Sequence, residues 1–169
     1  MVYKKIYKTM NEYDDIVMYS DGKYLIGLYF LESKNDFRRD LKIVDDDMGI
    51  FKDTERWLDE YFNGVIPNYI PKYRIDNLTE FRALVLDEII KIPYGKTVTY
   101  NDIAKVIARK KGIKKMSAQA VGGAVGWNPI GLIIPCHRVV GADGKLVGYG
   151  GGIKNKKALL EYEKIFDKK

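Results

Sequence analysis

Residues 133–140 read Ile-Ile-Pro-Cys-His-Arg-Val-Val and place the single cysteine of the chain, Cys136, directly before its single histidine, His137. The apolar residues on both sides predict a core strand that runs through this pair. A neighbouring imidazole is a common means of generating a thiolate near neutral pH, so Cys136 is a candidate nucleophile. A buried structural thiol is the alternative, because free cysteine is among the most buried residue types. Without a second cysteine, an internal disulfide and a multi-cysteine metal cage are both excluded.

The composition is that of an ordinary globular protein, with 46% hydrophobic and 31% charged residues in 169. No stretch approaches the roughly 20 apolar residues that span a membrane. The first residues are followed by acids instead of the apolar core of a signal peptide. We therefore expect a cytoplasmic protein with a reduced thiol and no membrane partner.

The net charge of +6 is unevenly distributed along the chain. Residues 1–78 carry 12 Lys or Arg against 15 Asp or Glu, whereas residues 79–169 carry 17 against 8. The excess of positive charge therefore lies in the half that contains Cys136, as expected of a surface that contacts a polyanion such as DNA. A lysine-rich solvated surface is the alternative explanation.

The first half of the sequence indicates an α+β module. Apolar runs at 16–19 and 24–30 flank the turn residues 20–22, which predicts a β-hairpin. Residues 51–62 have apolar positions at helical intervals and predict a helix. The stretch 65–76 contains two prolines and has the character of a linker, so we place a domain boundary there.

The second half indicates three helices, each with a polar residue suited to cap its N-terminus. Thr79 begins the first, Thr99 the second, and Ser117 a short third helix that runs to about Trp127. Gly112 marks the end of the second helix. Two short helices joined by a turn have the outline of a helix-turn-helix.

The third helix is rich in glycine, with Gly122, Gly123 and Gly126. Each costs roughly 1 kcal/mol relative to alanine in a helix interior. A helix that tolerates this cost usually needs close approach to its backbone. Its short side chains would let it enter a narrow groove, and the basic connector 109–115 precedes it. Close packing in a core is the alternative, which explains the glycines but leaves the cationic connector unexplained.

Further blocks of sequence surround the Cys-His pair. Residues 92–100 read Ile-Pro-Tyr-Gly-Lys-Thr-Val-Thr-Tyr, residues 118–129 Ala-Gln-Ala-Val-Gly-Gly-Ala-Val-Gly-Trp-Asn-Pro, residues 148–152 Gly-Tyr-Gly-Gly-Gly, and residues 161–163 Glu-Tyr-Glu. In this order and spacing, together with Pro-Cys-His-Arg, they resemble the methylated-DNA–protein-cysteine methyltransferases, the suicide repair proteins for O6-alkylguanine. The resemblance is specific in the second half of the chain and loose in the first.

The resemblance implies a fold of two domains. An N-terminal α+β domain of ribonuclease-H-like type is expected over 1–76, and a mainly helical C-terminal domain with a winged helix-turn-helix over 77–169. It also implies a monomer whose partner is double-stranded DNA containing O6-alkylguanine, without a cofactor or a metal.

The implied activity is DNA repair by direct, stoichiometric alkyl transfer. The protein flips the damaged base out of the duplex and moves a methyl or other alkyl group from O6-alkylguanine to Cys136. O4-methylthymine is a second candidate substrate. The product is a thioether, which thiol exchange does not reverse, so each molecule acts once.

The resemblance also assigns site residues. A water molecule links the thiol of Cys136 to His137, and Glu163 holds the other ring nitrogen, in the manner of a catalytic triad. Tyr100 donates a proton to the departing guanine, and the Asn128 side chain fixes the turn before the cysteine. Arg138 braces the site. The residues expected to contact the base are Val139, Tyr149 and Gly150. The residues expected to contact DNA in its minor groove are Thr99, Ser117, Ala118, Gln119, Ala120 and Gly122.

The sequence departs from the family pattern at three positions. Gln119 stands where most members carry an arginine that fills the space left by the flipped base, which predicts weaker DNA binding or slower repair. Gly150 replaces a small polar residue, so the loop around it is expected to be looser and to widen the range of alkyl groups accepted. The Trp127 side chain is larger than expected at this position, and the sequence offers no explanation for it.

Three other functions remain as alternatives. An alkyltransferase-like protein binds the lesion without transfer, but such proteins replace the cysteine that is present here. A cysteine hydrolase or thiol peroxidase usually takes its base from elsewhere in the chain, which has no other histidine. A winged-helix regulator with an inert cysteine would bind a defined DNA sequence without preference for alkylated bases.

Overall fold

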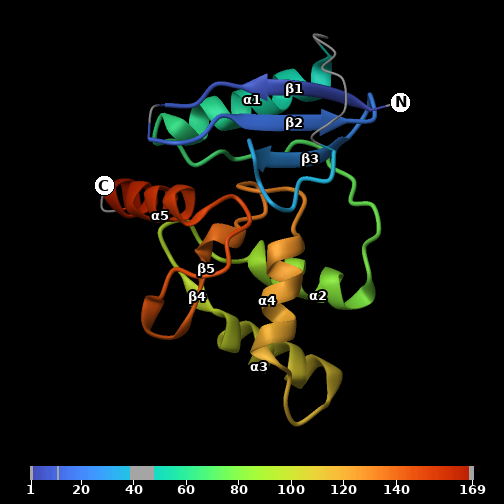
Figure 1. The fold of residues 1–169 in the computed structure, drawn as a ribbon, viewed down its shortest axis with the longest axis vertical. Coiled ribbons are helices and arrows are strands. Elements are labelled where there is room, and N and C mark those ends of the chain that lie inside the picture. Colours follow the sequence, from blue (N-terminus) through green and yellow to red (C-terminus); the bar gives the residue numbers. More distant parts are fainter. Residues whose placement is uncertain (1, 11, 39–47, 168–169) are drawn as a thin grey trace.

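The structure is a computed structural model and describes residues 2–10, 12–38 and 48–167. The elements follow the order β1 (Tyr3–Tyr7), β2 (Ile16–Ser20), β3 (Leu25–Phe30), α1 (Gly49–Phe62), α2 (Glu80–Ile89), β4 (Val98–Thr99), α3 (Tyr100–Lys111), α4 (Ala118–Trp127), η1 (Cys136–Arg138), β5 (Val139–Val140), η2 (Ala142–Gly144) and α5 (Ile153–Asp167). Helix α1 packs against the sheet of β1 to β3, and α2, α3 and α4 lie beyond the β3 edge of the sheet (Figure 1). Across these described ranges, no helix has the length and apolar character needed to cross a membrane.

The N-terminal half is an antiparallel sheet of order β1-β2-β3 packed against α1. The predicted hairpin is confirmed, with Ile16 paired to Phe30. The predicted helix is confirmed as α1, which buries one side that includes Phe51 and Trp57. Strand β1 was not predicted, and it extends the hairpin to three strands.

The outer edge of β3 is covered by segments from later in the chain. Its Leu25 N–H donates to the Lys72 carbonyl at 2.9 Å, and its Leu28 N–H donates to the Pro129 carbonyl at 2.8 Å. The Gly131 N–H in turn donates to the Leu28 carbonyl at 2.9 Å. An unpaired strand edge is a liability that proteins usually cover. These hydrogen bonds join the N-terminal and C-terminal halves of the chain. One cluster of buried hydrophobic residues contains members of both halves, and Cys136 is one of them.

The three predicted N-caps of the C-terminal half are confirmed. The Thr79 hydroxyl accepts from the third residue of α2 at 3.2 Å, and the Ser117 hydroxyl accepts from Ala120 of α4 at 3.2 Å. Thr99 and Asp102 form a reciprocal capping box at the start of α3. Such caps satisfy amide groups that have no partner within the helix. Helices α2, α3 and α4 pack against one another.

The predicted strand through Cys136 is wrong. The cysteine begins the short 3-10 helix η1, and only Val139 and Val140 form a strand, β5, which pairs in parallel with β4. Pro135 has no N–H for a strand ladder and its fixed φ favours a turn. The backbone coils instead, with the Cys136 N–H donating to the Ile134 carbonyl at 2.8 Å.

Candidate active site

A charged cluster lies directly behind Cys136. His137 Nε2 is 2.6 Å from Oε2 of Glu163, which reaches it from α5. The Arg138 guanidinium donates from Nε to Glu163 Oε1 at 2.7 Å and from Nη1 to the Ile92 carbonyl at 2.8 Å. The side chains of His137 and Glu163 are fully buried. The structure therefore brings together the three residues that the sequence resemblance associated with the cysteine.

The N-terminal half contributes a further partner to this cluster. The Tyr61 hydroxyl of α1 donates to Glu163 Oε2 at 2.6 Å and is fully buried. Burial, together with the charge of Glu163, raises the pKa of Tyr61 well above its usual value, so this hydroxyl stays a donor. Sequence reasoning missed Tyr61, because it looked like one more apolar position on a helix that packs against a sheet.

The cluster fixes the charge states around His137. Burial opposes ionisation of Glu163, but the charges and hydrogen bonds of His137 and Arg138 outweigh it and hold the pKa of that carboxyl well below its usual range. Burial lowers the pKa of His137 against the opposing pull of Glu163. When His137 is neutral and donates from Nε2 to Glu163, its Nδ1 is an acceptor for a proton. Nδ1 is buried and has no hydrogen-bond partner among the described residues.

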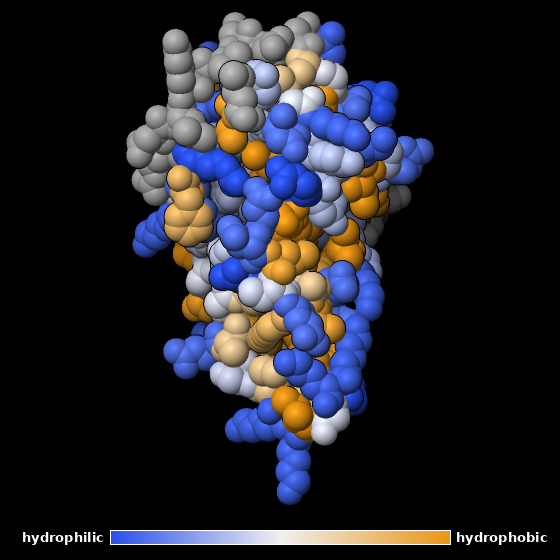
Figure 2. Space-filling model, turned by 90° about the vertical axis from the view of Figure 1, so that its right-hand side faces the viewer, coloured by the Kyte–Doolittle hydropathy of each residue, from blue (hydrophilic) through white to orange (hydrophobic). Residues whose placement is uncertain are grey.

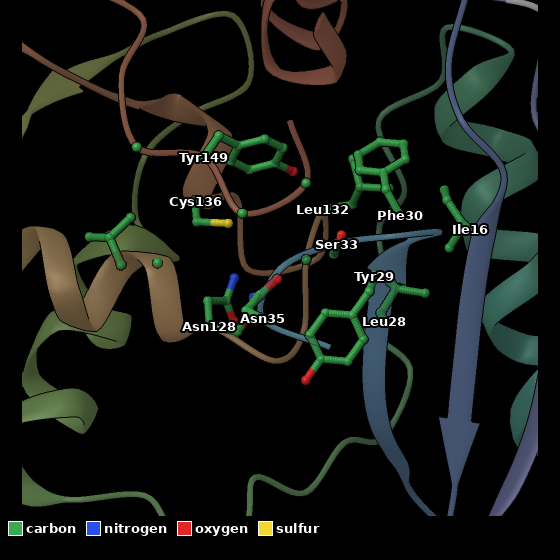
Figure 3. A pocket seen from close by; sticks show the side chains of 16 residues that line it. Ile16, Leu28, Tyr29, Phe30, Ser33, Asn35, Asn128, Leu132, Cys136 and Tyr149 are labelled. Carbon is green, nitrogen blue, oxygen red and sulfur yellow. The ribbon is translucent and has the colours of Figure 1, made fainter. Parts of the chain in front are cut away.

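Cys136 itself faces a small cavity. The residue is 7% exposed, and its sulfur points into a space of about 30 Å³ between the Tyr149 loop and the loop that follows β3 (Figure 3). Burial raises the pKa of the Cys136 thiol, although a hydrogen bond from Asn128 and the charge of Lys156 act in the opposite direction. Burial therefore favours the protonated thiol in this structure, while Asn128 and Lys156 favour the thiolate that the sequence predicted.

Asn128 fixes the turn between α4 and the cysteine. Its Nδ2 donates to the Ile134 carbonyl at 2.9 Å, and its Oδ1 accepts from the Ile130 N–H at 3.0 Å. The side chain is almost fully buried. This arrangement agrees with the expected role of Asn128 in holding the turn.

Tyr100 and Lys156 also lie close enough to Cys136 to interact with its charge. The Tyr100 hydroxyl donates to the Val147 carbonyl at 3.0 Å, and burial raises its pKa. Lys156 of α5 is buried and donates to the Val139 carbonyl at 2.6 Å and to the Val147 carbonyl at 3.1 Å. Burial lowers the pKa of Lys156 to about 8, although negative charge on Cys136 opposes this shift. Sequence reasoning missed Lys156, which lies in a lysine-rich run that looked like solvated surface.

The residues expected to contact the base surround the cysteine. Val139 follows η1 directly, and Tyr149 packs edge-on against Phe30 with ring centroids 6.5 Å apart. Tyr149 and Gly150 line the small cavity with Cys136. Their loop also accepts a hydrogen bond from the N-terminal half, because the Lys34 N–H donates to the Gly150 carbonyl at 3.1 Å.

A larger hollow of about 550 Å³ opens beside this cavity. It lies between the N-termini of α3 and α4 and the loop after β5, and Gly148 borders both spaces. The expected DNA-contacting residues on its wall are Thr99, Ala118, Gln119 and Gly122, together with Tyr100. Ser117 and Ala120 belong to the same end of α4 but do not line the hollow.

The glycines of α4 leave its surface open. A side chain at Gly123 or Gly126 would meet nothing within 4 Å, and one at Gly122 would only touch the Tyr100 ring at 3.8 Å. Close core packing therefore does not explain these glycines. The basic connector 109–115 is exposed, and hydrophilic side chains project from the end of the molecule where α3 and α4 lie (Figures 1 and 2).

Trp127, which the sequence left unexplained, has a partner in α2. The Arg82 guanidinium lies 4.0 Å from the centre of its ring. A cation over an indole is a favourable contact of about 0.5–1 kcal/mol at an exposed site. Trp127 therefore ties the end of α4 to α2.

The fold and the site indicate one class of protein. Its single cysteine lies in front of a hydrogen-bonded histidine–glutamate pair, next to a slim helix whose small side chains suit a groove of nucleic acid. Comparison with known proteins agrees. Residues 80–165 match the family described as 6-O-methylguanine DNA methyltransferase, DNA binding domain. A methylated-DNA–protein-cysteine methyltransferase of Mycobacterium bovis is 44% identical over 118 residues, which is 70% of this chain and 68% of that protein. One of Methanosarcina mazei is 38% identical over 151 residues, 88% of this chain and 89% of that protein.

Solved structures agree over nearly the whole chain. The O6-methylguanine methyltransferase of Mycobacterium tuberculosis superimposes with a TM-score of 0.80 at 36% identity, over 98% of this chain and 94% of that one. A structure of the Mycobacterium tuberculosis protein in complex with DNA has a TM-score of 0.81 at 35% identity, over 97% and 94%. The chain belongs to the methylated-DNA–protein-cysteine methyltransferase family.

Proposed function

We propose that this protein repairs DNA by transferring an alkyl group from O6 of guanine to the sulfur of Cys136. The observation that carries the proposal is the position of that sulfur, which faces a cavity with His137 and Glu163 hydrogen-bonded behind it. Family membership supports transfer over the alternative of lesion binding alone, since the matched relatives are named as methyltransferases.

In the proposed reaction, the bond between the alkyl carbon and guanine O6 breaks and a bond between that carbon and Sγ forms. The thiol proton moves toward Nδ1 of His137, through the water molecule that the family resemblance implies. The ionised Glu163 stabilises the resulting imidazolium. Tyr100 protonates the guanine as it leaves, and its phenol then regains a proton as the imidazolium gives up the one that came from the thiol. The product is an S-alkyl cysteine, so the stoichiometry is one alkyl group for each protein molecule.

Because the pKa of the Cys136 thiol is raised, we propose that the thiol is activated only when the alkylated base occupies the site. The cavity of about 30 Å³ is enough for a water molecule but far too small for guanine. We therefore propose that the base enters from the larger hollow, past Tyr100 and Gly148, and displaces the loop that now closes over the sulfur. In this scheme Val139, Tyr149 and Gly150 contact the base.

We further propose that α4 is the helix that enters the minor groove of double-stranded DNA. Its open glycine surface and the basic connector before it support this docking. The DNA contacts assigned on this basis are Thr99, Ser117, Ala118, Gln119, Ala120 and Gly122. O6-alkylguanine is the preferred lesion, and O4-methylthymine is a second candidate.

The finer description of the fold is also a proposal. The α+β fold is shared with the solved relatives. The sheet with α1 suits a ribonuclease-H-like domain over 1–76, and α3 and α4 followed by the loop after β5 suit a winged helix-turn-helix within 77–169. We propose that the protein acts as a monomer in the cytoplasm.

The direct test compares Cys136→Ala with the unaltered protein, using duplex DNA that carries a labelled methyl on guanine O6. The unaltered protein should acquire the label, and the variant should acquire none while still binding the lesion. Label on the Cys136→Ala protein would refute the assignment of the acceptor. Lesion binding without label on the unaltered protein would favour a lesion-binding function.

A further inference from the structure

Gly150 is not a glycine that its backbone requires. Its neighbours Gly148 and Gly152 have φ values of +67° and +95°, in the region that favours glycine, but Gly150 is not among the positive-φ residues. A side chain on residue 150 is therefore compatible with the local backbone. Some other feature of the structure must account for the missing side chain.

That feature is Asn35, in the loop that follows β3. A Cβ on residue 150 would lie 2.7 Å from Asn35 Oδ1, which is closer than real Cβ contacts, and a tight 3.0 Å from its Cγ, so the Asn35 carboxamide would have to move. The carboxamide of Asn35 thus occupies the space that a side chain on residue 150 would take. Figure 3 shows it beside Asn128 on the wall of the cavity that Cys136 faces.

One hydrogen bond holds the Asn35 side chain, and another holds the backbone of its neighbour Lys34. The Asn35 Nδ2 donates to the Asn128 carbonyl at 3.1 Å. The Lys34 N–H donates to the Gly150 carbonyl, also at 3.1 Å. The segment 34–35 therefore links two walls of the cavity, the Tyr149–Gly151 loop and the turn after α4, and both walls lie next to the sulfur.

We propose that Asn35 is a positioning and specificity residue of the alkyl-transfer site. Its side chain, from the N-terminal half, takes the place of a side chain on residue 150 and limits the size of the alkyl groups that fit in front of Cys136. The proposal rests on the proposed function. It replaces the expectation that Gly150 makes the loop looser, because Asn35 fills the vacated space and the neighbouring Lys34 N–H holds the Gly150 carbonyl.

The proposal predicts that residues 35 and 150 can exchange their side chains. Asn35 Cβ lies 3.6 Å from the point where a Cβ on residue 150 would stand, which is an ordinary contact. Alanine at 35 therefore leaves room for serine at 150. Gly150→Ser alone should be harmful, and the same change combined with Asn35→Ala should be tolerated.

The experiment is a double-mutant cycle of Asn35→Ala, Gly150→Ser and their combination, with Asn68→Ala as a matched control at an exposed asparagine. Single-turnover transfer from O6-methylguanine and O6-benzylguanine in duplex DNA, DNA affinity and the thermal midpoint are measured for each protein. Asn35→Ala should slow methyl transfer by about tenfold through misplacement of the loop, leave DNA affinity unchanged, and raise the rate of benzyl transfer relative to methyl transfer. The control should match the unaltered protein.

The cycle separates failure of this inference from failure of the proposed function. Recovery of the thermal midpoint and the transfer rate in the double variant, relative to Gly150→Ser, supports the exchange. Additive losses, or an unchanged benzyl-to-methyl ratio in Asn35→Ala, overturn it while transfer by the unaltered protein stands. If the unaltered protein takes no label, the proposed function has failed, and the thermal cycle alone still shows whether Asn35 and Gly150 exchange.

Discussion

The two halves of the molecule contribute to the site in different ways. Residues 79–169 contain Cys136, His137 and Glu163, the helix pair and the excess positive charge. Residues 1–78 carry more acids than bases and contribute hydrogen bonds through Tyr61, behind His137, and through Asn35, on the wall of the cavity.

The comparison shows how a chemical centre can depend on a region that contains none of its reacting groups. The C-terminal half has side chains whose chemistry identifies them. The N-terminal half acts by holding those side chains and by enclosing the sulfur, since Leu28 and Phe30 of β3 line the same cavity as Cys136. If the halves divide the work in this way, substitutions in each should have separable effects on chemistry and on stability.

The first prediction concerns the burial of the thiol, which both halves produce together. Because the pKa of Cys136 is raised, its thiolate fraction should increase about tenfold for each pH unit, and so about 100-fold between pH 7 and 9. Iodoacetamide reaches the sulfur only when the cavity opens transiently, and the rate at which it alkylates the native protein without DNA should rise accordingly. Urea-unfolded protein, whose thiol has an ordinary pKa, is the control. A rate that levels off below pH 8 would show that the resting site holds a thiolate.

The second prediction concerns Glu163, which bonds to Tyr61 of the N-terminal half and to His137 and Arg138 of the C-terminal half. Glu163→Gln should slow alkyl transfer by roughly 10²-fold, because the imidazolium loses its stabilising charge. It should also lower the free energy of unfolding by about 3–5 kcal/mol, because Arg138 is left without its buried partner. Single-turnover kinetics and urea unfolding measure the two effects, with the exposed Glu161→Gln on the same helix as control.

The sign of the pH dependence gives a further check on Glu163. A carboxyl whose pKa is lowered in the folded state contributes stability above its ordinary value of 4.5, and this contribution is lost as the pH falls below it. The Glu163→Gln variant should lack this part of the acid destabilisation. An identical loss of stability on acidification in both proteins would contradict the ionised, paired state of Glu163.

The third prediction isolates the contribution of the N-terminal half. Tyr61→Phe removes one hydroxyl donor from Glu163 and keeps the ring, so stability should fall by about 1.5–3 kcal/mol, as for a buried hydrogen bond to a charged group. Transfer should slow by a few-fold, since Arg138 still holds the carboxylate. Tyr24→Phe in the same half is the control. If Tyr61→Phe behaves like the control in both assays, α1 has no part in the support of the site.

The fourth prediction concerns only the C-terminal half. Gln119→Arg adds a cation and a planar stacking surface at the edge of the hollow. Binding to duplex DNA should strengthen by roughly two- to fivefold, the equivalent of about 0.5–1 kcal/mol. Gln119→Lys, which adds charge without the planar group, should gain less. No gain in binding or transfer rate would mean that α4 extrudes the base in another way.

The sequence predicted the elements that local chemistry determines. The caps at Thr79, Thr99 and Ser117 and the hairpin around Asp21 depend on residues a few positions apart, and each is present. The resemblance also identified the residues near Cys136, because the family pattern is dense there.

The sequence did not predict what depends on distant contacts. The strand expected through Cys136 is a 3-10 turn, since Pro135 overrides the apolar pattern. Tyr61 and Glu163 are 102 positions apart, and Asn35 and Asn128 are 93 apart. No spacing in one sequence indicates such pairs, and Lys156 carried no signal that distinguished it from the surface lysines around it.

The most direct test of the central claim is the mass of the intact protein after incubation with duplex DNA that contains O6-methylguanine, followed by peptide mapping. The expected gain is one methyl group in place of one hydrogen, on Cys136 alone, with no further gain when more DNA is added. An unchanged mass, or a methyl group on any other residue, would contradict it.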